Sequence, residues 1–403
     1  MQQREIPRPG GGVLHAYDSG PTGRDDELVV FWHGGTPNTG EPPRPLLGPA
    51  ATLGIRLLGA DRPGYGGTTR DPDAGVADVV PDVLAVADAA GVDRFAVLGH
   101  SGGGPRVLAC AALAPERVLA AVAISSPAPA DAAGLDRFVG MADGIVAEQR
   151  AVAAGRAALL TELAEAEFDE SAFTPSDHAA FEGPWGWFGP NVQAALAGGL
   201  DAEVDDLLAA GRPWGFALDR VRLPVLVVHG AADRMVPATH GAWLAEHLPG
   251  AELLLVADAG HIGVLEGASS VLAELRRRGR PIGRLDDPGG VQSRPSRSDR
   301  VAAGGPASCP RGARVVPYSY SCVASGPPAT RRGQPRTRRP PSRRRGGCSV
   351  ASSIRTRSSR RRRRRVAGTR SGSPASRRTR AAQVSSRSLA SSAANGRYSG
   401  SVR

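Results

Sequence analysis

The sequence contains no lysine, so every one of its 50 basic residues is an arginine. Cysteine is also rare, and only Cys110 lies before residue 281, within an apolar stretch. A single cysteine excludes a disulfide framework in that part of the chain and predicts a small core residue. No apolar run approaches the length needed to span a membrane, and the first residues lack the apolar segment of a secretory signal. Together these absences predict a soluble, cytoplasmic protein.

Charge divides the chain into two parts. Residues 1–280 contain 21 arginines against 36 acidic residues, a net charge of −15, whereas residues 281–403 contain 29 arginines against three acidic residues, a net charge of +26. The second part is rich in Ser, Pro and Gly and lacks apolar periodicity, so we expect a disordered tail there.

Three interpretations of this tail are open. Its arginine runs would bind nucleic acid without sequence preference. Alternatively, the tail is an inert solvated segment, or it is the product of a reading-frame error in GC-rich coding DNA. We favour the last two, and we expect nucleic-acid binding only through this tail.

Apolar runs alternate with helical patterns along residues 1–280. The runs are nearly continuous, as expected for parallel strands covered on both faces, and their alternation with helices predicts a doubly wound α/β sheet. Pro81 counts against regular helix early in the first predicted helix. The predicted strands span residues 28–32, 55–60, 94–99, 118–125, 224–230 and 251–257, and the predicted helices span 76–91, 103–115 and 239–250.

Residues 128–220 interrupt this alternation with helix-prone sequence rich in Ala, Asp and Glu. We expect a helical cap, inserted between core segments 1–127 and 221–280 and followed by the tail 281–403. Although aromatic residues make up only 4% of the chain, several gather near the end of this insertion. We expect most of them to pack within the cap. The candidates for lining a substrate pocket are Trp185, Trp187, Phe188 and Trp214.

The strongest motif is VLGHSGGGP, which places Gly-His-Ser-Gly-Gly between a predicted strand and a predicted helix. A nucleophile elbow has the form G-x-S-x-G in this context. The turn is so tight that side chains at Gly99 and Gly103 would collide with neighbouring backbone, and the serine is strained. The turn also sets Ser101 near a helix amino terminus, whose free N–H groups favour developing negative charge. Ser101 is therefore the candidate nucleophile.

A serine hydroxyl needs a general base. Of the eight histidines, His261 lies in a loop after the last predicted strand, from which it can reach back over the sheet. His100 adjoins the nucleophile, but neighbouring side chains diverge in such a turn. His229 ends a strand, and we interpret it as structural. The remaining candidates lie in an early strand or on helices and lack such a position: His15, His178, His240 and His247.

The base in turn needs an acid that holds its tautomer and stabilises its charged form. Asp233 follows the penultimate predicted strand, and the chain order Ser101, Asp233, His261 is the serine–acid–histidine order of folds with this elbow. Asp258 is a rival because it lies close to His261 in sequence, although that closeness disfavours the required facing geometry. Two weaker rivals follow an earlier strand: Asp131 and Asp136.

A developing oxyanion needs hydrogen-bond donors. The segment FWHGGTP overlaps the end of a predicted strand and continues into a glycine turn, so a backbone N–H can face the site without a side chain in the way. We assign the oxyanion hole to the N–H groups of Gly35 and Gly102 and interpret His33 as structural. After the next strand, we expect Asp61 and Arg62 to stabilise loops. No metal or organic cofactor is implied, since no Cys/His cluster has zinc spacing.

The motif set HGGTP, DRPGYGGT, GHSGG, HGAADRMVP and GHIGVLE resembles the α/β-hydrolase superfamily over about residues 10–278. The likeness is greatest to bacterial members with a cap, such as proline iminopeptidase-like enzymes, esterases and cofactor-free haloperoxidase-like hydrolases. It implies an α/β-hydrolase fold and a serine hydrolase that acts on a small-molecule ester or amide. Epoxide hydrolases and haloalkane dehalogenases resemble one another in carrying Asp where this chain has Ser101, which argues against those activities. Two alternatives stay open: a lyase or cofactor-free oxygenase using the same residues, and a non-catalytic small-molecule receptor.

Overall fold

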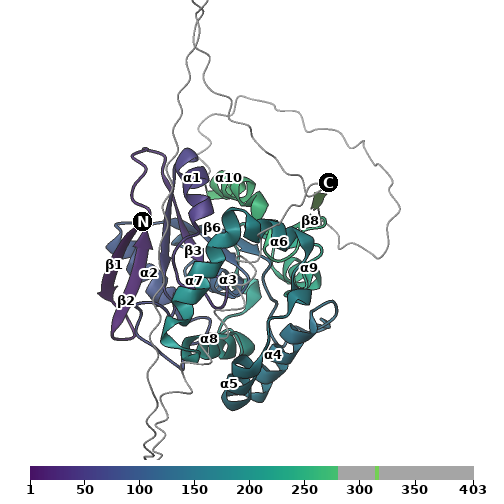
Figure 1. The fold of residues 1–403 in the computed structure, drawn as a ribbon. Helices are drawn as coiled ribbons and strands as arrows, with labels where there is room; N and C mark the ends of the chain where they lie inside the picture. Colours follow the sequence, from purple (N-terminus) through teal and green to yellow (C-terminus); the bar gives the residue numbers. More distant parts are fainter. Residues whose placement is uncertain (280–313, 317–403) are drawn as a thin grey trace, which may run out of the picture. The chain divides into compact units, whose positions relative to one another are not determined.

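The computed structural model describes residues 1–279 and 314–316. Within them, nine strands form one sheet in the order β1-β2-β4-β3-β5-β6-β7-β8-β9. β1 pairs antiparallel with β2, and β2 pairs antiparallel with β4, whereas the other neighbouring strands run parallel. The predicted doubly wound, mostly parallel α/β sheet is therefore confirmed (Figure 1). The strands are β1 (Gln2–Pro7), β2 (Val13–Asp18), β3 (Leu28–His33), β4 (Ile55–Ala60), β5 (Phe95–His100), β6 (Val118–Ile124), β7 (Val225–Gly230), β8 (Glu252–Val256) and β9 (Arg314–Val316).

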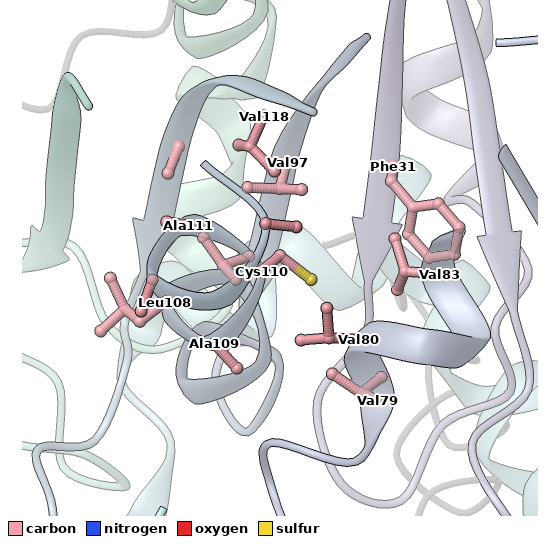
Figure 2. Close-up of a cluster of buried hydrophobic side chains, with 14 of the residues drawn as sticks. Phe31, Val79, Val80, Val83, Val97, Leu108, Ala109, Cys110, Ala111 and Val118 are labelled. Carbon is pink, nitrogen blue, oxygen red and sulfur yellow. The ribbon is translucent and has the colours of Figure 1, made fainter. Parts of the chain in front are cut away.

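Side chains alternate along each strand and build a hydrophobic core on each face of the sheet. On β5, Phe95 and Val97 join one core, whereas Ala96 and Leu98 join the other. Figure 2 shows part of the first core, where Cys110 packs as the small core residue expected from the sequence. The helices on this face are α2 (Val79–Ala89), α3 (Gly103–Leu113) and α9 (Ala238–His247), and those on the other are α1 (Arg44–Thr52) and α10 (Ala268–Gly279).

The first predicted helix, 76–91, is shorter in the structure and begins at Val79. Pro81 is then the third helical residue. The N–H groups of the first turn have no partner within a helix, so the missing N–H of proline removes no hydrogen bond there. The proline therefore marks the start of this helix rather than an interruption.

Five helices lie between β6 and β7 in the chain, within the predicted cap 128–220. Figure 1 shows α4, α5 and α8 grouped together, and they pack on one another around Leu159 and Val204. The cap boundaries themselves stay predictions. These helices are α4 (Asp143–Ala154), α5 (Arg156–Glu165), α6 (Pro175–Glu182), α7 (Phe188–Ala195) and α8 (Asp201–Gly211).

Most of the predicted tail 281–403 lies outside the described residues. Within residues 281–403 the structure describes β9, which pairs in parallel with β8. Two of its three residues, Val315 and Val316, are β-branched, and β-branched residues favour strands. Among the described residues, no helix is both long and apolar enough to cross a bilayer.

Candidate active site

Ser101 occupies a strained turn between β5 and α3. Its φ of 53° lies in the left-handed region, which costs a residue with a side chain about 1–2 kcal/mol. The Ser101 N–H donates to the Ile124 carbonyl at 2.8 Å, which ties the turn to β6. A Cβ at Gly99 would lie 2.7 Å from the Gly103 carbonyl oxygen, and one at Gly103 would overlap the His33 carbonyl. The two glycines are therefore required by close backbone approach.

Asp233 and His261 are joined by a hydrogen bond. Asp233 Oδ2 lies 2.8 Å from His261 Nδ1, and Asp233 Oδ1 accepts the backbone N–H groups of Met235 at 3.0 Å and Val236 at 2.9 Å. The loop after β7 thus fixes one carboxylate oxygen and leaves the other for the imidazole. This arrangement assigns the proton of His261 to Nδ1 and leaves Nε2 as the free base.

Electrostatics at this pair favours the charged form of each group. Burial disfavours the His261 imidazolium, but the charge and hydrogen bond of Asp233 outweigh burial, so the pKa of His261 lies above its ordinary value. Burial would also raise the pKa of Asp233, yet His261 and His229 hold that pKa well below its usual range. Asp233 therefore stays ionised and can stabilise an imidazolium formed on His261.

His229 is a second imidazole beside the same carboxylate. Its Nε2 lies 2.8 Å from the Val236 carbonyl oxygen and 3.5 Å from Asp233 Oδ2. The shorter contact shows that His229 holds the loop that carries Asp233. The three rival acids, in contrast, are exposed side chains: Asp131, Asp136 and Asp258.

Gly35 lies directly against Ser101, the candidate nucleophile. A Cβ at Gly35 would be 3.0 Å from Ser101 Cβ and 3.5 Å from Ser101 Oγ. Within the described part of the chain, neither the Gly35 N–H nor the Gly102 N–H donates to an acceptor. Two free N–H groups beside a serine are what an oxyanion hole requires.

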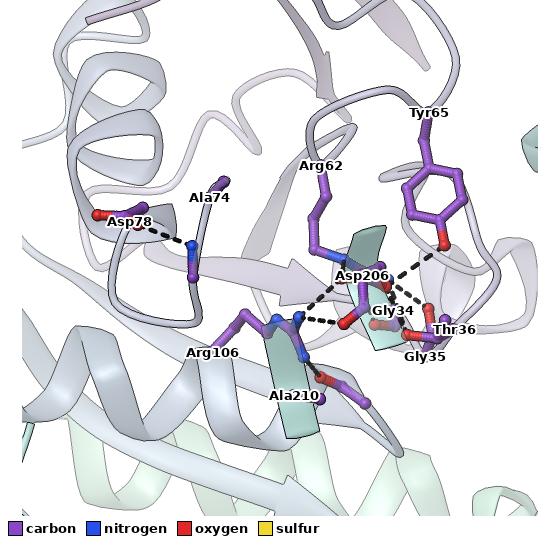
Figure 3. A network of polar contacts seen from close by, with 12 residues as sticks. Gly34, Gly35, Thr36, Arg62, Tyr65, Ala74, Asp78, Arg106, Asp206 and Ala210 are labelled. Carbon is purple, nitrogen blue, oxygen red and sulfur yellow. Dashed lines mark hydrogen bonds and ion pairs between the residues drawn. The ribbon is translucent and has the colours of Figure 1, made fainter. Parts of the chain in front are cut away.

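A buried ionic network holds the turn that carries Gly35 (Figure 3). Arg62 donates to the carbonyl oxygens of Gly34 at 2.8 Å and Gly35 at 2.7 Å. In a trans peptide the C=O of one residue and the N–H of the next point in opposite directions. Because Arg62 binds the Gly34 carbonyl, the Gly35 N–H is directed away from Arg62.

Asp206, on cap helix α8, is the centre of this network. It binds Arg62 at 2.7 Å and Arg106 at 2.7 Å, and Arg106 also donates to the Gly102 carbonyl at 2.8 Å. Burial would raise the pKa of the Asp206 carboxyl, but the guanidiniums of Arg106 and Arg62 lower it to about 2. One cap carboxylate therefore contacts both arginines that hold the two candidate oxyanion glycines.

From the sequence, Arg62 was expected only to stabilise a loop, and Arg106 and Asp206 were not predicted as site residues. One signal was available, because Arg106 interrupts the otherwise apolar helix GGPRVLACAAL. A buried arginine requires an acidic partner. The partner itself could not be named, since Asp206 lies 100 residues further along the chain.

A cavity of about 360 Å³ connects the candidate catalytic residues with the cap. Its wall includes Ser101, Gly35 and His261 together with aromatic side chains of the insertion. Phe188 is the one predicted aromatic among them. The others were not among the named pocket candidates: Phe168, Phe173 and Phe181.

Trp185, Trp187 and Trp214 do not line this cavity, which corrects their expected position. Trp185 stacks on Phe188 with ring centroids 5.8 Å apart, and Trp187 packs edge-on against Phe188 at 5.2 Å. Trp214 is buried in the sheet core, where its indole N–H donates to the Ala210 carbonyl. These indoles therefore support the cap from behind Phe188 or within the core.

His100 also departs from expectation. Its ring does not diverge from the site but lines the cavity, with its centroid 4.8 Å from that of His261. His100 Nε2 lies 2.9 Å from the His261 carbonyl oxygen, and burial lowers the pKa of His100 to about 3. A neutral His100 thus donates to the backbone of His261 and fixes that loop.

The sequence is similar to those of known hydrolases. A sequence model of the family described as "alpha/beta hydrolase fold" matches residues 27–268. A pimeloyl-[acyl-carrier protein] methyl ester esterase of Aromatoleum aromaticum is 44% identical over 68 residues, or 17% of this chain and 25% of the esterase. The chain therefore aligns with only a quarter of that relative.

Longer matches have other activities in their names. The dihydrolipoyllysine-residue acetyltransferase component of the acetoin cleaving system of Pseudomonas putida is 30% identical, covering 66% of this chain and 68% of that protein. The 2-hydroxy-6-oxo-6-phenylhexa-2,4-dienoate hydrolase of Burkholderia cepacia is 27% identical, covering 64% and 87%. An enol-lactonase structure from Burkholderia xenovorans LB400 has a TM-score of 0.51 at 18% identity, covering 68% and 98%, and shows a similar fold.

Proposed function

The chain belongs to the alpha/beta hydrolase fold family, and we propose that within this family it is a serine hydrolase that cleaves an ester or amide bond of a small molecule. The observation that carries this proposal is the 2.8 Å hydrogen bond between Asp233 and His261, with Ser101 and His261 on the wall of one cavity. A nucleophile, a base and an orienting acid are the parts that acyl transfer needs.

The mechanism has two steps. His261 Nε2 takes the proton of Ser101 as Oγ attacks the carbonyl carbon, and the Gly35 and Gly102 N–H groups bind the oxyanion. When the tetrahedral intermediate collapses, His261 returns the proton to the leaving alcohol or amine, and an acyl group stays on Ser101. Water then attacks this acyl-enzyme with His261 again as base, which releases the acid and restores the serine.

The nucleophile distinguishes this proposal from some of the relatives. An epoxide hydrolase of Mycobacterium tuberculosis is 31% identical over 120 residues, covering 29% of this chain and 33% of that protein. The side chain at the strained turn of this chain is a serine, whereas the resemblance places an aspartate at this position in epoxide hydrolases. We therefore propose ester or amide cleavage over epoxide opening.

A second candidate is hydrolysis of a carbon–carbon bond beside a ketone. It is favoured by the match to the Burkholderia cepacia dienoate hydrolase, which extends over 87% of that protein. The same serine and histidine would serve either reaction, so the geometry alone favours neither.

The test is a panel of p-nitrophenyl esters, aminoacyl p-nitroanilides and a 2-hydroxy-6-oxohexa-2,4-dienoate, assayed with the wild type and Ser101→Ala. We expect release of p-nitrophenol or p-nitroaniline by the wild type and none by the variant. Turnover of the dienoate alone would establish the second candidate. Turnover of no substrate, together with binding of some of them, would instead make the protein a receptor.

A further inference from the structure

Glu203 differs from the other buried acidic residues. Eight acidic side chains are buried in the described part of the chain, and seven of them accept hydrogen bonds or pair with cations. Glu203 is 6% exposed and forms neither a hydrogen bond nor an ion pair with any described residue. Its neighbours on α8, Asp205 and Asp206, each bind two arginines.

The unpaired carboxyl lies on the wall of the cavity that contains Ser101. Each of three packed cap helices contributes one glutamate to this wall: Glu148 from α4, Glu162 from α5 and Glu203 from α8. Two more acids complete the set, Glu167 and Asp169. Within the described residues no arginine lines the cavity, and the chain has no lysine.

Of these acids, Glu203 is buried without a partner, whereas Asp169 accepts the backbone N–H groups of Gly144 and Ser171. An unpaired carboxylate in an apolar site is disfavoured by several kcal/mol and takes up a proton instead. Burial accordingly raises the pKa of Glu203 to about 8 and that of Glu148 to about 7. A second carboxyl nearby adds to the effect, since the charge of Glu148 further disfavours ionisation of Glu203. A cation bound beside Glu203 would compensate its charge and keep the carboxylate ionised.

We propose that Glu203, with Glu148 beside it, binds a cationic group of the substrate, an ammonium or a guanidinium, inside the catalytic cavity. The inference that this group belongs to a substrate rests on the proposed function, whereas the binding of a cation at Glu203 does not. The cationic group would take the role for Glu203 that arginines take for Asp205 and Asp206 on the same helix. The apolar remainder of the substrate packs on the phenylalanines of the wall, Phe173 and Phe188.

The experiment compares two esters of equal length. In p-nitrophenyl 6-aminohexanoate an ammonium replaces the terminal methyl of p-nitrophenyl heptanoate. We expect the wild-type full-length chain to prefer the ammonium ester in kcat/KM. Glu203→Gln should lower the ratio of the two values by about tenfold to a hundredfold, the loss expected for a charge-assisted hydrogen bond.

The control is Glu165→Gln, which removes one negative charge from an exposed position on α5. It should leave the ratio within about twofold of wild type, since an exposed charge is screened. Glu203→Gln should also leave the melting temperature unchanged or raised, because it removes an unpaired buried carboxyl. An unchanged ratio, or a wild type that prefers the neutral ester, would overturn the proposal.

Binding is measured separately from catalysis with n-hexylammonium chloride and Ser101→Ala in a calorimeter. We expect binding to Ser101→Ala and its loss when Glu203→Gln is added, with n-hexanol as the neutral reference. If neither ester is turned over but hexylammonium binding depends on Glu203, the proposed hydrolase fails and the cation site stands. If esters are turned over but hexylammonium binding does not depend on Glu203, the cation site fails and the proposed hydrolase stands.

Discussion

Replacing Asp206 by Asn tests whether one cap carboxylate holds the two arginines that bind the Gly35 and Gly102 carbonyls. Asn keeps the shape of the side chain and removes its charge. The side chains of Arg62 and Arg106, which are 7% and 2% exposed, would then remain buried without the anion that each of them binds at 2.7 Å. Breaking a buried ion pair on one side costs about 3–5 kcal/mol, because the remaining charge is left uncompensated.

The assay is the free energy of unfolding in urea, with Asp201→Asn as the matched control. Asp201 lies on the same helix and pairs with Arg70 at 3.4 Å and Arg156 at 3.9 Å, but its side chain is 54% exposed. Exposed pairs contribute about 0–1 kcal/mol. We therefore expect Asp206→Asn to lose about 3–5 kcal/mol and Asp201→Asn to lose less than about 1 kcal/mol.

The pH dependence follows from the low pKa of Asp206. A carboxyl whose pKa falls on folding stabilises the protein above its unfolded pKa of about 3.9, and this contribution is lost as pH falls toward the folded value. The difference between wild type and Asp206→Asn should therefore shrink between pH 4 and the folded pKa of about 2. Equal stabilities of Asp206→Asn and Asp201→Asn at neutral pH would refute the reasoning.

Three further predictions concern the cavity beside Ser101 and His261. Asp233→Asn should lower turnover by about 10⁴-fold if it sets the tautomer of His261, whereas Asp258→Asn should stay near wild type; the opposite result would transfer the role of the acid to Asp258. The apparent pKa of the acid limb of the pH–rate profile should lie above the ordinary histidine value of about 6.5. The reason is that activity requires neutral His261, whose pKa is raised. An apparent pKa below 6 would contradict this prediction. Phe188→Leu should change the preference among acyl chain lengths; an unchanged ranking would remove Phe188 from the substrate wall.

The sequence was most informative where burial is continuous. β3 to β7 are buried almost throughout, so their apolar runs are unbroken. β8 has an apolar run as well, although only Leu253 in it is fully buried, and all six strands were predicted. β1 has the opposite character, since five of its six residues are exposed. Its polar sequence, QQREIP, carries no periodic signal.

The candidate site was predictable only in part, and for a physical reason. Ser101, Asp233 and His261 each follow a strand within a short motif, so local sequence identifies them. Asp206 and Glu203 lie on the same cap helix and differ only in what surrounds them in space. Asp206 binds two arginines, whereas Glu203 lines an open cavity. No local sequence pattern distinguishes these two environments.

The most direct test of the central proposal is a mass measurement on Ser101 itself. The full-length chain is treated with a fluorophosphonate, which phosphonylates a serine only when a base activates it. We predict the addition of one phosphonyl group, located by peptide sequencing to Ser101, with no addition to Ser101→Ala and a much slower addition to Asp233→Asn. A wild-type chain that stays unmodified, or that is modified equally after Ser101→Ala, would contradict the proposed serine hydrolase.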